Sequence, residues 1–126
     1  MKYILDTNAL IYSLCNPAGL TKIASQIITT EKELYVSIAS FWEIAIKQSL
    51  GKLAINSTIP DIEKICKQRS IEIIPILSDE IEGIKSLPQI HKDPFDRLII
   101  SQALKHNMSI ITSDTIIPQY AVNVVW

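Results

Sequence analysis

Short runs of consecutive apolar residues alternate along the chain with longer segments in which apolar residues recur at helical spacing. A strand covered on both faces reads as a continuous apolar run, whereas a half-exposed strand alternates apolar and polar residues. Parallel strands need long connections, and the helical segments have the required length. We therefore predict an α/β fold, a three-layer α/β/α sandwich around a central, mainly parallel sheet. The expected strands are Tyr3–Leu5, Leu34–Ile38, Ile71–Ile76, Met108–Ile111 and Ala121–Trp126.

Helical periodicity, together with capping residues, places helices in the connections. Ser40 and Glu43 have the spacing of a capping box. Ser78 is expected to cap a later helix, and Asp93 caps the last one, in which Pro94 takes the first position. The expected helices run from Asp6 or Thr7 to about Leu14, and over Thr21–Thr30, Ser40–Leu50, Asp61–Arg69, Ser78–Leu87 and Asp93–His106.

The composition predicts a substantial core and no strong electrostatic field. Of the 126 residues, 48% are hydrophobic, which suits a single domain over residues 1–126. The 12 basic and 13 acidic residues give a net charge of -1, so binding to nucleic acid must rest on a local patch. No signal peptide is expected, and the apolar runs are shorter than the ~20 residues of a membrane span, so we expect a cytoplasmic protein. Cys15 and Cys66 lack metal-ligand spacing and are expected to be buried free thiols.

Four isolated carboxylates stand where strands end or helices begin, in an otherwise apolar chain. Asp6 follows the first expected strand and Asp114 the fourth, while Glu43 and Asp96 lie near the starts of helices. In open parallel sheets, ligands bind beyond the carboxyl ends of the strands, where the strand order reverses. We therefore expect these four side chains at one edge of the sheet.

Each carboxylate alone has a structural explanation. Asp6 and Asp114 can cap a helix or a turn, and Glu43 precedes Lys47 by four residues, which is a stabilising helical spacing. Together, however, unpaired carboxylates in one pocket repel one another and raise each other's pKa. A Mg²⁺ or Mn²⁺ ion removes this conflict because hard cations prefer oxygen ligands. Neither histidine has a partner at zinc-ligand spacing, and a hard cation held by carboxylates favours hydrolysis of phosphodiesters.

Four segments occur in an order that resembles one known family. They are Ile4–Ile11 with its Asp-Thr-Asn, Ser40–Lys47, His91–Ile99 with His-Lys-Asp-Pro-Phe-Asp-Arg, and Ile111–Asp114. On these segments the chain resembles a PIN-domain ribonuclease of the VapC toxin type, from residue 3 to the terminal Val125-Trp126. The resemblance implies a parallel sheet of strand order 3-2-1-4-5 and an endoribonuclease that depends on Mg²⁺ or Mn²⁺. It also implies a cognate antitoxin, a toxin homodimer, and an RNA substrate such as transfer or ribosomal RNA.

The same resemblance assigns roles to particular residues. Asp6, Glu43, Asp96 and Asp114 match the acidic quartet of the family that holds the metal. Asp6 and Asp96 correspond to its main direct ligands, Glu43 completes the set directly or through water, and the role of Asp114 is the least constant. Groups that position the ligands or water would come from Thr7, Asn8 and Ser113. The basic residues nearest the acids are interpreted either as contacts to the RNA backbone or as solvated or ion-paired surface charges: Lys47, Lys92 and Arg97.

Other residues in these segments are expected to be structural. His91 is interpreted as a loop or structural residue rather than a general base, and Trp42 and Phe95 as core residues rather than stacking platforms. The surfaces that meet the antitoxin and the second subunit are expected on the helices Thr21–Thr30 and Asp61–Arg69, because both are amphipathic.

Other classes of protein remain open at this point. A haloacid-dehalogenase-like phosphohydrolase also has an aspartate after its first strand, but position 8, where it needs a second aspartate, holds Asn8. A receiver domain needs paired acids at that strand end, and only Asp6 is present. The third alternative is a PIN domain that only binds a partner, and the intact set of four acids argues against it.

Overall fold

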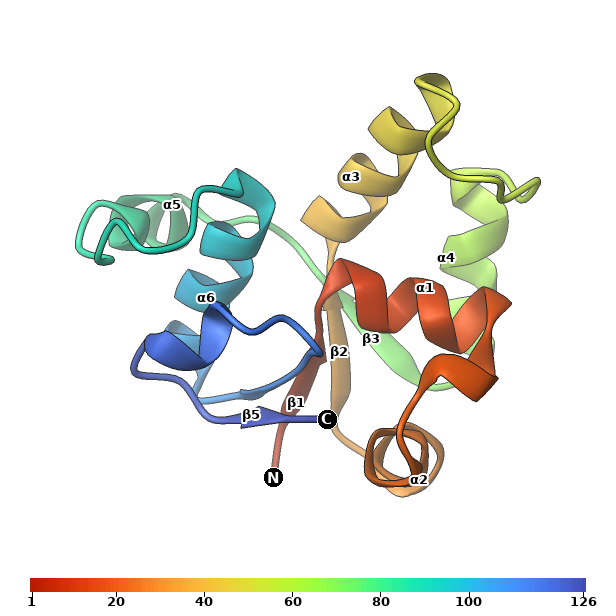
Figure 1. The fold of residues 1–126 in the computed structure, drawn as a ribbon, viewed down its shortest axis with the longest axis horizontal. Helices are drawn as coiled ribbons and strands as arrows, with labels where there is room; N and C mark the ends of the chain where they lie inside the picture. Colours follow the sequence, from red (N-terminus) through yellow and green to blue (C-terminus); the bar gives the residue numbers. More distant parts are fainter.

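The computed structural model describes residues 1–126 and contains a five-stranded sheet with helices on both faces (Figure 1). All strand pairs are parallel, and the order β3-β2-β1-β4-β5 confirms the predicted fold class and strand order. In chain order the elements are β1 (Tyr3–Leu5), α1 (Thr7–Cys15), η1 (Pro17–Gly19), α2 (Lys22–Thr30), β2 (Leu34–Ser37), α3 (Ile38–Ser49), α4 (Ile59–Gln68), β3 (Ile71–Ile74), α5 (Ser78–Ile84), α6 (Pro94–His106), β4 (Ser109–Ile111), η2 (Ile117–Gln119) and β5 (Val124–Val125). None of the helices has the length and apolar character needed to cross a membrane.

The central strand β1 determines where a functional edge can form. Leu5 lies opposite Val36 of β2 and Ile111 of β4, so Asp6 and Thr112 leave the sheet side by side at its carboxyl edge. The chain builds outward through β2 and β3 on one side of β1, and through β4 and β5 on the other. In such a sheet the ligand site lies where this direction reverses, which here is between β1 and β4.

Each face of the sheet carries its own apolar core, because neighbouring residues of a strand point to opposite sides. Leu5 packs with Leu10 of α1 and Ile44 of α3, whereas Ile4 packs with Ile99 of α6. All five side chains are fully buried, and burial of each contributes about 1.5–3 kcal/mol to folding. Strands covered on both sides in this way explain the continuous apolar runs in the sequence.

Helix α3 begins earlier than the sequence predicted. Its N-cap is Ser37, whose hydroxyl accepts a hydrogen bond from the Ala39 N–H at 3.1 Å. Ser40 therefore lies inside the helix, and the predicted capping box with Glu43 is wrong. The Ser40 hydroxyl instead accepts a hydrogen bond from Thr7 Oγ1 at 3.0 Å, which ties α3 to α1.

Two other local predictions are also wrong. Ser78 does not cap α5, because Leu77 occupies the cap position and its N–H donates to Glu80 Oε1 at 2.9 Å. Cys15 is exposed because α1 ends there, while Cys66 is buried as predicted.

Candidate metal centre

Asp6 divides its two carboxylate oxygens between the start of α1 and the edge of the sheet. Oδ1 accepts a hydrogen bond from the Ala9 N–H at 2.8 Å, which caps the helix. Oδ2 accepts a hydrogen bond from the hydroxyl of Thr112, the residue that follows β4. Asp6 is 3% exposed. This burial, together with the charges of Asp114 and Glu43, raises its pKa from 3.8 to about 6 despite the two hydrogen bonds.

Asp96 lies in the first turn of α6, which its neighbour Asp93 caps as predicted. Asp93 Oδ1 accepts hydrogen bonds from two N–H groups at the helix start, including that of Asp96 at 3.1 Å. Burial of the Asp96 carboxylate raises its pKa from 3.8 to about 7, and the charges of Asp93, Asp6 and Glu43 act in the same direction. The ring of His91 opposes this rise. Without a cation, Asp96 is therefore only partly ionised at neutral pH.

Glu43 is buried in the second turn of α3, and only one of its two carboxylate oxygens has a partner. Its Oε2 lies 3.0 Å from Nζ of Lys47, one turn further along the helix. Its Oε1 is buried and has no hydrogen-bond partner. A buried carboxylate oxygen without a partner is costly unless a donor or a cation meets it. Oε1 is therefore a position that a metal ion would satisfy.

Asp114 follows β4 and divides its oxygens in the same way as Asp6. Oδ1 accepts hydrogen bonds from the N–H groups of Ile116 and Ile117 at 2.6 and 3.0 Å, while Oδ2 lies 3.0 Å from His91 Nε2. The Asp114 N–H donates to Thr112 Oγ1 at 2.9 Å, so one hydroxyl connects Asp114 to Asp6. Partial burial raises the pKa of Asp114, but the hydrogen bonds from His91 and the two N–H groups outweigh this and hold it below 3.8.

His91 lies in the loop before α6, in agreement with its interpretation as a loop or structural residue, and it joins two of the four acids. Its Nε2 lies 3.0 Å from Asp114 Oδ2 and 3.1 Å from Asp96 Oδ2, and the ring is buried. The ligand-type atoms of these three side chains all lie within 4.8 Å of one another. Asp6 is connected to Asp114 through the Thr112 hydroxyl, and the charges of Asp6 and Glu43 both raise the pKa of Asp96, so these two acids adjoin the group. The structure thus brings all four predicted acids together.

Arg97 is neither a surface charge nor placed to contact RNA, so both interpretations offered by the sequence are wrong for this residue. The side chain is buried, and its guanidinium donates to the carbonyl oxygens of Pro88 at 2.9 Å and Ile84 at 3.1 Å. It also donates to the hydroxyl of Tyr120 at 3.2 Å. That hydroxyl in turn accepts the His91 N–H at 2.7 Å. Arg97 and Tyr120 therefore fix the loop that carries His91.

The remaining predicted site residues differ in their surroundings. Thr7 is buried and holds α3 against α1, whereas Asn8 and Ser113 are exposed and make no hydrogen bond through their side chains. Lys92 is exposed next to His91 in the sequence. The ion pair with Glu43 supports the ion-paired interpretation of Lys47.

Trp42 is not a core residue, which corrects the prediction from sequence. Its side chain is 60% exposed on α3 and packs edge-on against Phe95 of α6, with ring centroids 5.2 Å apart. Helix α3 is apolar almost all round, so its periodicity does not reveal which side faces solvent.

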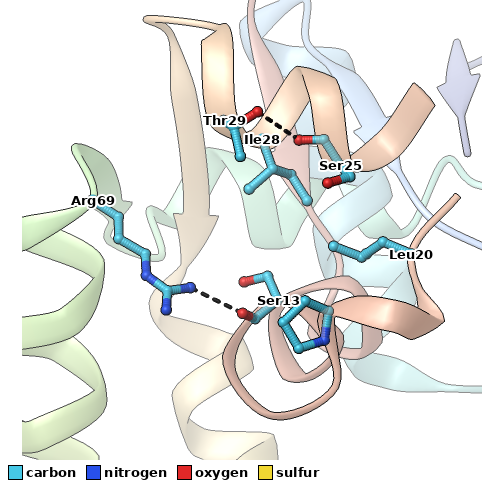
Figure 2. Close-up of a pocket in the computed structure, with 7 residues that line it drawn as sticks. Ser13, Leu20, Ser25, Ile28, Thr29 and Arg69 are labelled. Atoms are coloured by element: carbon cyan, nitrogen blue, oxygen red, sulfur yellow. Dashed lines mark hydrogen bonds between the residues drawn. The ribbon is translucent and has the colours of Figure 1, made fainter. Parts of the chain in front are cut away.

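The largest cavity lies at the far end of α1 from Asp6 and is not part of the acidic cluster. Its volume is about 420 Å³, and residues of α1, α2 and the end of α4 line it. Figure 2 shows Arg69 reaching across to donate to the Ser13 carbonyl, a contact of 2.9 Å. Leu20 and Ile28 supply apolar lining, and Ser25 and Thr29 add hydroxyl groups.

Fold and site together define a parallel α/β domain that gathers four carboxylates where its strand order reverses. The PIN domain family matches residues 3–123, and the chain therefore belongs to this family.

Individual proteins and structures are similar to the chain over most of its length. Ribonuclease VapC22 of Mycobacterium tuberculosis (strain ATCC 25618 / H37Rv) is 28% identical over 114 residues, which cover 88% of this chain and 85% of that protein. The crystal structure of VapBC2 from Rickettsia felis bound to a DNA fragment from its promoter has a TM-score of 0.73 at 17% identity, covering 99% of this chain and 98% of the other. A toxin-antitoxin complex from Klebsiella pneumoniae has a TM-score of 0.65 at 20% identity, covering 99% and 97%.

Proposed function

We propose that this protein is a metal-dependent endoribonuclease and the toxin of a type II toxin–antitoxin pair. The observation that carries the proposal is the cluster of four carboxylates at the switch point of the sheet, in which Glu43 Oε1 is buried without a partner. Membership of the PIN domain family and similarity to Ribonuclease VapC22 support the nuclease activity. The toxin role is supported by the similar fold found in toxin–antitoxin complexes.

The residues present fit a hard divalent cation. Burial and mutual repulsion raise the pKa values of Asp6 and Asp96, and a cation would relieve both effects. The donor atoms are carboxylate oxygens, which favour Mg²⁺ or Mn²⁺ over zinc. Asp6, Glu43, Asp96 and Asp114 would hold the ion.

A bound divalent cation lowers the pKa of water and neutralises charge that develops on a phosphate. The chain's own residues orient the reactants. Thr112 fixes Asp6 and Asp114 relative to each other, and Lys47 places positive charge beside Glu43. A carboxylate of the cluster, Asp96 or Glu43, would orient the attacking water or accept its proton, and Asp96 is held in position by the Asp93 cap at the start of α6.

The proposed partners need surfaces outside the acidic cluster. The antitoxin would bind at the cavity between α2 and the end of α4, because these are the two amphipathic helices on which the sequence predicted a partner surface. For a homodimer, exposed apolar side chains occur on α3 at Ile38 and Trp42, at Leu77 before the first residue of α5, and on α5 at Ile81. These helices lie on either side of α6 in Figure 1. An RNA substrate, such as transfer or ribosomal RNA, implies a cytoplasmic site of action.

The test compares the wild-type protein with D6A and D96A on labelled RNA, with Mg²⁺ or Mn²⁺ and with EDTA. Each substitution should lower the cleavage rate by more than about 100-fold, because a metal ion lowers the activation barrier by several kcal/mol and each variant loses one of its ligands. D79A is the matched control, since Asp79 is an exposed acid that pairs with Lys105 away from the site. Cleavage that persists in EDTA, or in both site variants, would refute the proposal of a metal-dependent nuclease at this site. A chain that binds its antitoxin but cleaves no RNA would instead be a non-catalytic PIN module.

A further inference from the structure

The hydrogen bonds of His91 define which ring nitrogen carries the proton. Nδ1 lies 3.1 Å from the backbone N of Asp93, and that N–H donates to it. A backbone N–H can only donate, so Nδ1 must present its lone pair. The single proton of the neutral ring is then on Nε2, which lies 3.0 Å from Asp114 Oδ2 and 3.1 Å from Asp96 Oδ2.

The same geometry argues against a metal bond to His91. A histidine that binds a metal usually donates its other ring N–H to a carboxylate or a carbonyl. Here the other nitrogen faces a donor, so it cannot carry a proton without placing two hydrogens between the same two atoms. Coordination through Nε2 would also remove the proton that the Asp114 carboxylate accepts.

We propose that His91 is a positioning residue, which holds Asp96 and Asp114 together through its Nε2–H and stays outside the ligand set of the ion. This inference rests on the metal centre of the proposed function. Two further contacts keep the ring in place: the His91 N–H donates to the Tyr120 hydroxyl, and Asp93 is itself fixed as the cap of α6. The centre that results has oxygen ligands only, which is the donor set that Mg²⁺ and Mn²⁺ prefer.

The first test determines the protonation of the ring directly. Protein labelled with ¹⁵N-histidine gives long-range proton–nitrogen correlation spectra, and H106Q removes the signals of the only other histidine. We expect a protonated Nε2 and an unprotonated Nδ1 at neutral pH, in the metal-free protein and after saturation with Mg²⁺. A proton on Nδ1, or loss of the Nε2 proton when Mg²⁺ is added, would overturn the proposal.

The second test measures the affinity for Mn²⁺ by electron paramagnetic resonance. H91A should weaken binding by about 10- to 100-fold, which is the usual effect of removing an orienting partner. H91Q should recover most of the affinity, because an amide N–H can still donate to the two carboxylates, and H106Q should match the wild type. Equal losses in H91A and H91Q, no loss in H91A, or an imidazole nitrogen coupled directly to Mn²⁺ would each contradict the proposal.

The two tests separate this inference from the proposed function. Neither the spectra of the metal-free protein nor the Mn²⁺ affinity depends on cleavage of RNA. If H91A does not fold, the spectra and H91Q still decide the outcome. A protein that binds Mn²⁺ as expected but cleaves no RNA would refute the nuclease and leave the role of His91 standing.

Discussion

Removal of a single hydroxyl group, in Y120F, should destabilise the protein far more than its size suggests. Tyr120 is buried, and its hydroxyl accepts hydrogen bonds from the N–H groups of Ile90 at 3.2 Å and His91 at 2.7 Å. It also accepts one from Arg97 and donates to the Pro88 carbonyl at 2.8 Å. Four polar groups, three from the loop of residues 88–91 and one from Arg97, therefore meet at one oxygen.

The magnitude follows from which groups lose their only partner. Arg97 and the Pro88 carbonyl keep their bond to each other at 2.9 Å, so they stay satisfied in the variant. The His91 N–H is buried and is left without an acceptor, whereas the Ile90 N–H is partly buried and can regain water. An unsatisfied buried group costs about 1–3 kcal/mol, so we expect a total loss of about 2–4 kcal/mol.

Urea unfolding of the metal-free protein measures this loss, and Y3F is the matched control. Tyr3 is also buried, but its hydroxyl contacts only the sulfur of Met1 at 3.7 Å. Y120F should lower the midpoint without a change in slope, and Y3F should leave the midpoint close to the wild-type value. Equal stabilities for Y120F and Y3F would show that the hydroxyl does not hold the loop, and the account of the His91 loop would fail.

Three further predictions concern charge and metal. In the metal-free folded protein, the pKa of Asp6 is raised from 3.8 to about 6 and that of Asp96 from 3.8 to about 7. The folded state therefore binds more protons than the unfolded state at pH values between 3.8 and these raised pKa values. Its free energy of unfolding should therefore fall, by an amount on the order of a few kcal/mol, as the pH rises from about 4 to about 7. Urea titrations across this range check the sign, and a rise in stability would contradict it; D96N should flatten the curve. Mg²⁺ at a hundred times its dissociation constant should raise the free energy of unfolding by about 2.7 kcal/mol, measured as a higher Tm that EDTA reverses, and D79A should respond like the wild type. H106A should lower the free energy of unfolding in urea by about 1–3 kcal/mol, because it leaves Oε2 of the buried Glu80 without its hydrogen-bond partner, and a variant as stable as the wild type would show that the contact is not needed.

The sequence predicted the strands and the acidic edge because both depend on local rules. Continuous apolar runs indicate strands covered on both faces, and the residues that follow parallel strands share one edge. Thr112 was within reach of the same reasoning, since it follows β4 in register with Asp6 after β1, but the sequence directed attention to Ser113 beside Asp114. Ser113 proves to be exposed, and Thr112 makes the contact with Asp6.

His91 and Arg97 were not predictable from local patterns. Their positions depend on a loop whose carbonyl groups surround the guanidinium of Arg97, and on Tyr120, which lies 29 residues after His91 and 23 residues after Arg97. A charged residue in a motif is normally expected at the surface, and only this set of buried acceptors makes its burial favourable. The exposure of Trp42 was equally hidden, because a helix that is apolar on every side carries no signal of its orientation.

Capping and metal binding were alternative explanations for the acids when only the sequence was considered, but the two oxygens of a carboxylate can serve both. In Asp6 and Asp114, Oδ1 accepts backbone N–H groups, while Oδ2 faces Thr112 or His91 at the centre of the cluster. The bonds to the backbone hold each side chain in one orientation before any ion binds. An ion then meets ligands whose conformational entropy has already been lost in folding, which favours its binding. Glu43 lacks such a backbone contact, and its unpartnered Oε1 is accordingly the oxygen whose environment an ion would change most.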